Sequence, residues 1–357
     1  MTLWVVKLGT SLLRGDTAAA IEGFTARIAA AQHRGDSVVL VTSGAVGLGC
    51  QRLGLTQRPE SVLSLQAAAA VGQGYLMALY ERAMERHGIK VAQVLLTRSD
   101  LADRRRYQNA SGSLRQLLEW GVLPVVNEND AISPAELRFG DNDTLSALVA
   151  AAVGAHQLIL LTDVDRLYSA DPRVDADARP ISDVHHPREL EALQAGAGDG
   201  GRWGTGGMTT KLAAARIATA SGITVHLADG RDPDPLDVVL AGGRGGTVFH
   251  PHPEPLGNRR SWLAHVLQPE GVLHLDAGAC AALQHRGASL LLVGITAVDG
   301  DFESSCAVSL VDPAGEEFGR GLCSIASSSL RNALAASDAL SRSTVVVHRD
   351  ALVLNHR

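Results

Sequence analysis

The sequence predicts an α/β fold, an α/β/α sandwich around a mainly parallel sheet, followed by a small, mostly β domain at the C-terminal end. Two observations predict the first part. Apolar runs of strand length alternate with segments of helical periodicity, and the runs end in glycine-rich or polar turns, as in βαβ units. A third observation is the proline-rich stretch 251–255, which marks a domain edge because proline continues neither a helix nor a central strand. Beyond it, short alternating runs predict strands.

The length of 357 residues favours two domains. We place an α/β domain at 1–257, a linker at 258–269, a β domain at 270–348 and a loose tail at 349–357.

The composition is that of a soluble globular protein, with 46% hydrophobic and 20% charged residues. A net charge of −6 gives no general attraction to nucleic acid or anionic membranes. The four cysteines show no zinc-binding spacing. We expect no signal peptide and no stretch long and apolar enough to span a membrane. We therefore expect a cytoplasmic protein.

The first βαβ unit is the clearest. Residues 3–6 predict a buried strand that ends in Lys7-Leu8-Gly9-Thr10-Ser11, and the helix predicted at 17–34 is followed by a strand at 37–41. This second strand ends in the glycine-rich turn 42–47. Ligands of parallel sheets bind beyond the carboxyl ends of the strands, so both turns are expected to face one crevice.

The following elements continue the alternation. We expect helices at 61–87, 106–120, 144–153 and 209–221, strands at 91–96, 122–126, 157–161 and 223–227, and a short hairpin at 131–139. The helix at 61–87 is expected to be interrupted near Gly72 and Gly74.

Lysine usage indicates a phosphate site. The chain has only three lysines, at 7, 90 and 211, among 32 basic residues. Lys7 and Lys211 lie in Gly/Ser/Thr-rich turns, where a compact ammonium group beside exposed backbone amides suits a phosphoryl group.

Acidic residues cluster in one segment between two predicted elements. Glu128 and Asp130 follow a strand, and Asp141 and Asp143 precede a helix. An acidic residue at a helix N-terminus is also ordinary capping, so the argument for function depends on the cluster. Such carboxylates can hold lysine ammonium groups or bind Mg²⁺ through water.

Several familiar motifs are missing. The chain has no P-loop, no dinucleotide-binding fingerprint after the first strand and no nucleophile elbow around Ser43. We interpret the His185-His186 pair as a solvated turn rather than a metal site, because the pair lacks a carboxylate or cysteine at the spacing expected of metal ligands.

Six motifs in order resemble those of the amino-acid kinase family over roughly residues 1–250. They are Lys7 to Ser11, Val41-Thr42-Ser43-Gly44-Ala45, Asn127-Glu128-Asn129-Asp130, Gly140-Asp141-Asn142-Asp143, Leu161-Thr162-Asp163 and Gly204 to Lys211. The resemblance is to the branch that phosphorylates the γ-carboxylate of L-glutamate, and it implies ATP and Mg²⁺ as cofactors, the first step of proline synthesis and inhibition by proline.

The resemblance also implies roles for individual residues. Catalysis would depend on Lys7, Lys211 and Asp143. Glutamate would be held by Ser43, Gly44, Asp130 and Asn142. ATP would be held by Lys7, Gly9, Thr162, Asp163, Thr205, Gly206, Gly207, Met208, Thr209, Thr210 and Lys211. No residue is predicted as a direct protein ligand to a metal.

Residues from about 270 to 348 resemble a PUA domain, a module that binds RNA elsewhere. Four arginines, no lysine and nine acidic residues give this segment a formal charge of −5, which is unfavourable for counterion release from RNA. We therefore favour a structural or regulatory role for this domain.

Three alternatives stay open. The chain could be a sibling kinase acting on aspartate, acetylglutamate or carbamate, an RNA-binding protein with a kinase-like body, or a regulatory pseudokinase. We expect ATP and L-glutamate as small-molecule partners, proline as an inhibitor, no membrane or nucleic-acid partner, and a homo-oligomer.

Overall fold

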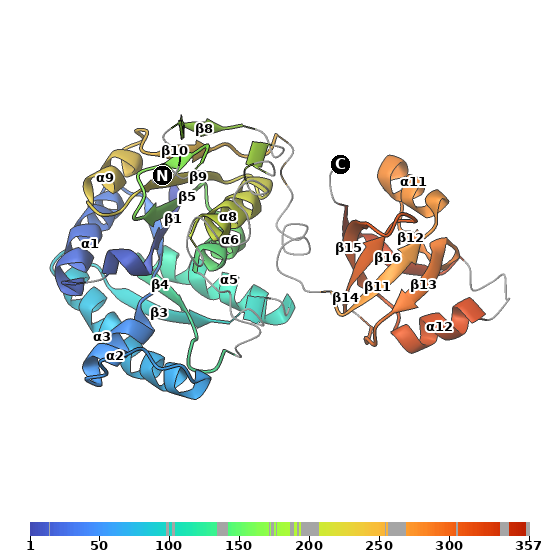
Figure 1. Cartoon of the computed structure of the whole chain (residues 1–357), viewed down its shortest axis with the longest axis horizontal. Coiled ribbons are helices and arrows are strands. Elements are labelled where there is room, and N and C mark those ends of the chain that lie inside the picture. Colours follow the sequence, from blue (N-terminus) through green and yellow to red (C-terminus); the bar gives the residue numbers. More distant parts are fainter. Residues whose placement is uncertain are drawn as a thin grey trace. The chain divides into compact units, whose positions relative to one another are not determined.

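The computed structural model describes residues 1–13, 15–97, 100–101, 104–133, 142–170, 172, 175, 177–185, 189–190, 193, 207–253, 255, 269–304, 306–335 and 343–354 (Figure 1). Two compact units are present, Met1–Pro255 and Leu256–Arg357. The boundary between them lies within three residues of the predicted end of the α/β domain.

The first unit is organised around an eight-stranded sheet with the order β3-β4-β2-β1-β5-β9-β10-β8. Its strands are β1 (Leu3–Leu8), β2 (Ser37–Val41), β3 (Val91–Leu96), β4 (Leu123–Glu128), β5 (Gln157–Thr162), β8 (Asp183–Val184), β9 (Thr224–Asp229) and β10 (Thr247–Phe249). The six strands from β3 to β9 in this order are parallel, while β10 is antiparallel to β9 and β8 is parallel to β10. A separate ribbon pairs β6 (Leu167–Tyr168) with β7 (Pro180–Ile181).

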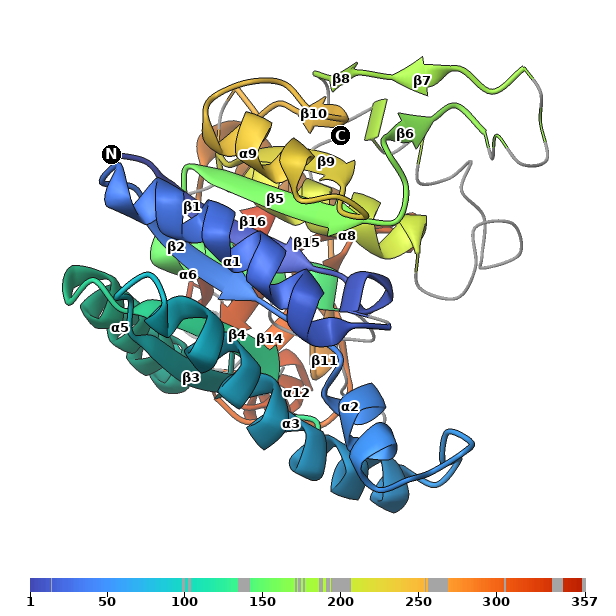
Figure 2. The same ribbon diagram turned by 90° about the vertical axis from the view of Figure 1, so that its left-hand side faces the viewer.

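Helices cover both faces of this sheet. One face carries α1 (Thr17–His33), α3 (Val62–Glu85) and α9 (Asp234–Leu240), and the other carries α5 (Arg104–Glu119), α6 (Asn142–Val153) and α8 (Met208–Ala220). Figure 2 shows α1 in front of β1 and β2, with α6 behind the sheet. The α/β/α sandwich and the parallel sheet predicted from the sequence are confirmed.

The central strands are apolar on both sides because helices pack on both faces. Val38, Leu40, Leu158 and Leu160 are completely buried. The short helix η1 (Thr10–Leu13) follows β1 directly, so the chain turns tightly at the carboxyl end of this strand.

The predicted interruption of the helix at 61–87 is wrong, because α3 runs unbroken from Val62 to Glu85. Gly72 of α3 instead permits close packing against α2 (Ala45–Arg52). A Cβ atom on Gly72 would lie 1.8 Å from the carbonyl oxygen of Ala45, and one on Gly49 would lie 1.7 Å from that of Ala68. Two helices whose backbones approach this closely leave no room for any side chain at those positions.

By length and composition alone, α3 could also cross a membrane, contrary to our expectation that no segment would pass that test. Within the first unit it packs against α1, α2 and β3, and it buries Leu76, Tyr80 and Met84. These contacts account for the buried third of its apolar window, while Leu63 and Val71 on the same helix are exposed.

In the described residues of the second unit, a six-stranded sheet is accompanied by the α-helices α11 and α12. Its elements are β11 (Gly271–Leu275), α11 (Ala277–Arg286), β12 (Leu290–Leu291), η3 (Leu292–Gly294), β13 (Ile295–Asp299), β14 (Ala307–Val311), β15 (Glu317–Cys323), α12 (Ser327–Ala335) and β16 (Val345–Leu354). The strand order is β12-β16-β15-β14-β11-β13, and the core includes Leu273, Leu310 and Val347. The mostly β domain is therefore confirmed.

The loose tail predicted at 349–357 is wrong for its described part. Residues 349–354 form the second half of β16, where Leu352 pairs with Gly321 and Leu354 with Gly319 of β15. Ala351, Leu352 and Val353 are buried, so this end of the chain contributes to the core. Residues 355–357 lie outside the described part of the chain.

Candidate active site

Two lysines that are far apart in the sequence meet at one buried carboxylate. The ammonium nitrogen of Lys7 lies 2.5 Å from Oδ1 of Asp143, and that of Lys211 lies 3.1 Å from Oδ2. The exposed fractions of Lys7, Asp143 and Lys211 are 2%, 0% and 8%. The structure therefore brings the three predicted catalytic residues together.

Each member of this group occupies the end of a regular element. Lys7 is the penultimate residue of β1, and Asp143 lies in the first turn of α6. Lys211 lies in the first turn of α8, where its ammonium group also donates to the carbonyl oxygen of Gly207 at 3.0 Å. The geometry thus depends on one strand and two helices, which are rigid supports.

The net charge of this group favours an anion. Two ammonium groups share one carboxylate, which leaves one unit of positive charge in a place almost closed to water. Burying a charge is expensive unless it is paired, and the low dielectric strengthens its attraction to a ligand of opposite sign. The group is therefore suited to a phosphoryl group or another anion.

The N-terminus of α8 adds backbone donors to the same place. Gly207 precedes the helix and provides no side-chain cap, so the first amides of this 13-residue helix carry the partial positive charge that favours an anion. The hydroxyl group of Thr210 donates to Oδ2 of Asp143 at 3.0 Å. Met208 is buried, and Thr209 is exposed. The predicted residues Thr205 and Gly206, like Asp141, lie outside the described residues.

The turns after β1 and β2 meet, as the sequence predicted. Ser43 donates to the carbonyl oxygen of Leu8 at 3.0 Å, and Thr10 donates to the Ser43 hydroxyl group at 3.0 Å. A Cβ atom on Gly9 would lie 3.4 Å from the carbonyl oxygen of Leu161 and 3.8 Å from the Lys7 ammonium nitrogen. Gly44 has a φ of 97°, a left-handed conformation that favours glycine, at the start of α2.

Asn142 is held by a buried network of polar groups. Its side-chain amide donates to the carbonyl oxygen of Thr42 at 2.5 Å and to Oδ1 of Asn127 at 2.7 Å. Asn127 in turn donates to Oε1 of Gln73 at 2.9 Å, while the Thr42 hydroxyl group bonds to the Tyr80 hydroxyl group at 2.7 Å. Burial raises the pKa of Tyr80 above its usual value, so its hydroxyl group stays protonated.

The sequence interpretation missed Gln73 and Tyr80. Both lie on α3, and nothing in their spacing distinguishes them from other residues of that helix. The Nε2 group of Gln73 is buried and has no hydrogen-bond partner among the described residues. Helix α3 therefore supports this end of the site from the opposite face of the sheet.

The other predicted residues lie at the same edge of the sheet. Asp130 follows β4 and is partly buried, and Thr162 ends β5 beside Asp229 of β9. Thr162 donates to the carboxylate of the exposed Asp163 at 3.1 Å. Asp163, Gly230 and Arg231 line a cavity of about 300 Å³ that extends towards α1, and neither Lys7 nor Lys211 lines it.

Comparison with known proteins agrees with this geometry. Residues 2–229 match the amino acid kinase family, and residues 271–338 match the PUA domain. The chain therefore belongs to the amino acid kinase family, and the resemblance predicted from the motifs is confirmed.

Its curated relatives cover the whole chain. Proteins named glutamate 5-kinase from Parasynechococcus marenigrum (strain WH8102) and Synechococcus sp. (strain CC9902) are 78% and 77% identical to it, over 100% of both chains in each case. The glutamate 5-kinase of Synechococcus elongatus (strain ATCC 33912 / PCC 7942 / FACHB-805) is 51% identical, over 98% of this chain and 99% of the relative.

A solved structure shares the fold of the first unit. The carbamate kinase from Giardia lamblia bound to AMP-PNP superposes with a TM-score of 0.53 and 17% sequence identity, covering 70% of this chain and 99% of that one. At this identity the likeness concerns the fold alone.

Proposed function

We propose that the chain is a glutamate 5-kinase, which transfers the γ-phosphoryl group of ATP to the γ-carboxylate of L-glutamate. The product would be L-glutamyl 5-phosphate, in the first step of proline biosynthesis. The observation that carries this proposal is the meeting of Lys7 and Lys211 at Asp143. The full-length relatives named glutamate 5-kinase support the choice of substrate.

The chemistry requires little beyond positioning and charge. A glutamate carboxylate is ionised at neutral pH and needs no general base, but it must approach an anionic triphosphate. We assign Lys7 and Lys211 to the oxygens of the transferring phosphoryl group, where their charge stabilises the transition state. Asp143 acts as a positioning residue because it holds both ammonium groups in place.

Glutamate would be bound at the ends of β2, β4 and α6. Ser43 bonds to the carbonyl oxygen of Leu8, the residue after Lys7, so we assign Ser43 and the backbone of Gly44 to the reacting carboxylate. Asp130 provides an anionic group for the α-ammonium group of the substrate. Asn142, held by Thr42 and Asn127, provides an oriented amide.

ATP would be bound around the start of α8 and the end of β5. We assign the triphosphate to Gly9, Gly207, Met208, Thr209 and Thr210 together with the two lysines, and the nucleoside to Thr162 and Asp163. The same proposal includes Thr205 and Gly206, which lie outside the described residues.

Mg²⁺ is also part of the proposal. Both oxygens of Asp143 already contact ammonium groups, so this carboxylate does not suit a metal ion. We therefore assign Mg²⁺ to the triphosphate oxygens and water, where it would neutralise phosphate charge.

A direct test is to trap the acyl phosphate with hydroxylamine after incubating the purified chain with Mg·ATP and L-glutamate. We expect a hydroxamate that depends on L-glutamate. Release of ADP with aspartate, acetylglutamate or carbamate but not with glutamate would support a sibling kinase instead. Absence of turnover with all four acids would support the pseudokinase alternative.

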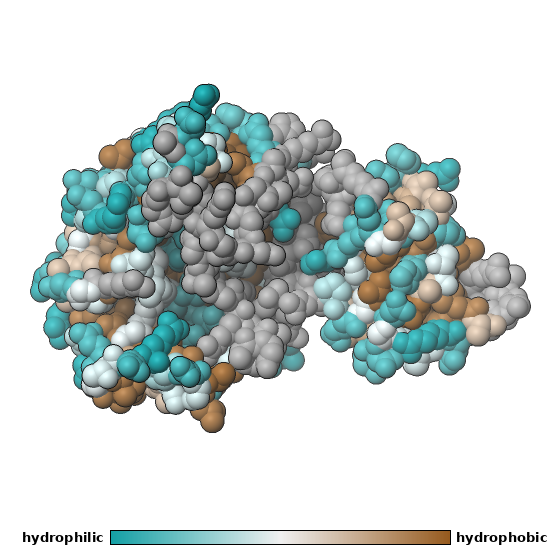
Figure 3. Space-filling model, viewed as in Figure 1, coloured by the Kyte–Doolittle hydropathy of each residue, from teal (hydrophilic) through white to brown (hydrophobic). Residues whose placement is uncertain are grey.

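Regulation and assembly complete the proposal. We propose that proline inhibits the enzyme, which the same assay tests when proline is added. We also propose a cytoplasmic homo-oligomer, supported by exposed apolar side chains of the α2–α3 region, including Leu53, Leu63 and Val71. Figure 3 shows hydrophobic residues on the visible surface around these helices. Sedimentation of the chain and its Leu63→Glu variant tests the assembly.

RNA binding by the second unit is the weaker alternative. Its formal charge of −5 over residues 270–348 opposes a phosphate backbone. Filter binding of structured RNA at two salt concentrations tests it, and micromolar, salt-sensitive binding would favour this alternative.

A further inference from the structure

A group of two histidines and one aspartate lies at the edge of the large sheet. The strands that carry it are separated from β1, which carries Lys7, by other strands of the sheet. Strands β8 and β10 are the last two of the sheet, and β10 is three positions from β1. In the parallel pairing of these strands, Val248 lies opposite Asp183 and Phe249 opposite Val184. The register therefore continues to His250 opposite His185.

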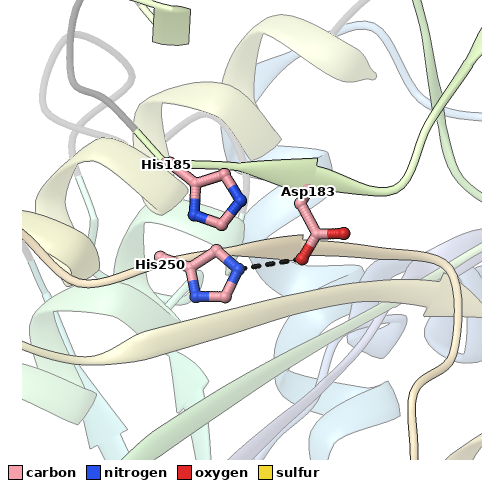
Figure 4. Close-up of side chains that lie close together, drawn as sticks. All are labelled: Asp183, His185 and His250. Atoms are coloured by element: carbon pink, nitrogen blue, oxygen red, sulfur yellow. Dashed lines mark hydrogen bonds and ion pairs between the residues drawn. The ribbon is translucent and has the colours of Figure 1, made fainter.

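This register brings the three side chains to one face. Residues two apart on a strand point to the same side, so Asp183 and His185 share a face with His250. The rings of His185 and His250 stack with their centroids 4.2 Å apart and their planes at 11°. Figure 4 shows a nitrogen of each ring on the side towards the Asp183 carboxylate.

The ligand atoms are close enough for one ion. Nε2 of His250 lies 2.9 Å from Oδ1 of Asp183, and one potential ligand atom from each of the three residues lies within 4.8 Å of the others. In a tetrahedral zinc site, bonds of about 2.0–2.2 Å place ligand atoms roughly 3.4 Å apart. Because the two rings are stacked nearly parallel, one of them must turn about its side-chain bonds before a nitrogen lone pair of each ring can point at the same ion.

We propose that Asp183, His185 and His250 form a binding site for a divalent transition metal ion, with Zn²⁺ as the best match. The two imidazoles favour Zn²⁺ over Mg²⁺, which prefers oxygen, and zinc also accepts a carboxylate beside them. The three protein ligands leave a fourth position, and the exposed side chain of His185 gives water access to it.

The nearby charged and titratable groups do not prevent this assignment. The guanidinium group of Arg244 lies 3.4 Å from Oδ1 of Asp183, but its side chain is exposed and can turn into solvent. His226 is engaged by Gln157 at 2.8 Å and is not a member of the site.

Metal binding would connect two short edge strands. Strand β8 has two residues and β10 has three, so few backbone hydrogen bonds hold this edge. An ion that binds the folded state alone stabilises it by mass action, because the unfolded chain keeps no preformed site. The site is therefore expected to stabilise the edge of the first unit without entering the phosphoryl-transfer chemistry.

The test is zinc binding by the full-length protein, freed of metal with a chelator, measured by calorimetry and by the cobalt absorption spectrum. We expect one equivalent of Zn²⁺ with micromolar affinity and a Co²⁺ spectrum of four-coordinate type. His185→Ala, His250→Gln and Asp183→Asn should each weaken binding by about tenfold or more, as for loss of one ligand group. His285→Ala, which removes an exposed histidine of the second unit, is the matched control and should bind as wild type.

A second readout guards against loss of folding in the variants. Zinc at about a hundred times its Kd should raise the midpoint of thermal unfolding of the wild-type protein by about 5–10 °C, and this increase should vanish in His185→Ala. The His185 side chain is exposed, so this variant should fold normally. Zinc binding that is equal in the wild type and all three variants, or no wild-type binding at 100 micromolar zinc (about a hundred times the expected Kd), would overturn the proposal.

Discussion

The two units of this chain bury different kinds of side chains. The first unit closes two ammonium groups, a carboxylate and a network of amides and hydroxyl groups away from water, including Lys7, Asp143 and Asn127. Among the described residues of the second unit, the buried polar side chains are those of Ser309 and Ser327. The second sheet instead encloses an apolar cluster around Leu273 and Leu310.

This difference indicates where the chemistry lies. Burying charge costs free energy that apolar packing would not, so it persists where an anionic ligand or a reaction uses it. The described part of the second unit buries mainly apolar side chains. If the catalytic groups lie in the first unit alone, substitutions there should change activity, and substitutions in the second unit should change stability alone.

The largest effect is expected from removing one ammonium group. Lys211→Ala or Lys7→Ala should lower kcat by about 10²–10³-fold, because each removes a preorganised charge at the transferring group. Steady-state ADP release with L-glutamate measures the change. Lys90→Ala is the control, since Lys90 is exposed and should be silent. Turnover close to wild type in either test variant would remove that lysine from the proposed mechanism.

A core substitution in the second unit should have the opposite result, a loss of stability without a loss of activity. Leu310 is completely buried in β14, so Leu310→Ala should lower the free energy of unfolding of that unit by about 2–5 kcal/mol. Hydrogen exchange of the full chain resolves the two units, and kcat at 25 °C should stay within about twofold of wild type. A kcat that falls together with the stability of the second unit would show that turnover depends on that unit being folded.

Acid should destabilise the first unit selectively. Burial, with a smaller contribution from His250, lowers the pKa of His226 from its usual 6.5 to about 4. The unfolded chain therefore binds a proton at higher pH than the folded one. The stability contributed by neutral His226 is complete above pH 6.5 and is lost as pH falls towards 4, by about 3 kcal/mol or less.

Denaturant unfolding of the first unit at several pH values measures this loss. His226→Gln should flatten the dependence between pH 6.5 and 4. In the second unit, His274 and His285 are not buried, so its stability should change less over this range. If the free energy of unfolding of the variant changes with pH as steeply as that of the wild type, other groups cause the acid sensitivity.

The smallest effect is expected at the polar network behind the glutamate site. Tyr80→Phe removes the partner of the Thr42 hydroxyl group, and the carbonyl group of Thr42 holds Asn142. We expect the KM for L-glutamate to rise about 3–10-fold with a smaller change in kcat, as for one lost hydrogen bond to a substrate-binding group. Tyr75→Phe on the same helix is the matched control. Equal changes in both variants would indicate a general effect on α3.

The fold was predictable because apolar periodicity is local. Alternating strands and helices, with polar turns at the strand ends, identify a parallel sheet and the edge at which its ligands bind. The sequence interpretation was wrong at α3, where Gly72 was treated as an interruption although it permits the approach of the Ala45 carbonyl group. It was also wrong at β16, because a short polar stretch hid the buried residues 351–353.

The site was predictable only where its residues stand in short motifs. Ser43, Asn142, Thr162 and the lysines adjoin glycines or polar turns that mark them. The resemblance to a family supplied their roles. Gln73 and Tyr80 lie in a helix with no distinguishing motif. Their part in the site depends on how α3 packs against the sheet. Asp183 precedes His185 by two residues, but His250 is 65 positions away, so the group became apparent only through the pairing of β8 with β10.

The sequence by itself determined the order of strands and helices, the glycine-rich turns and the two lysines suited to phosphate, because these depend on neighbours along the chain. Only the tertiary structure decided that Lys7 and Lys211 share Asp143, that α3 supports Asn142, and that two histidines stack beside an aspartate. The physical reason is that contacts between distant residues are set by sheet register and helix packing, which no short window of sequence contains.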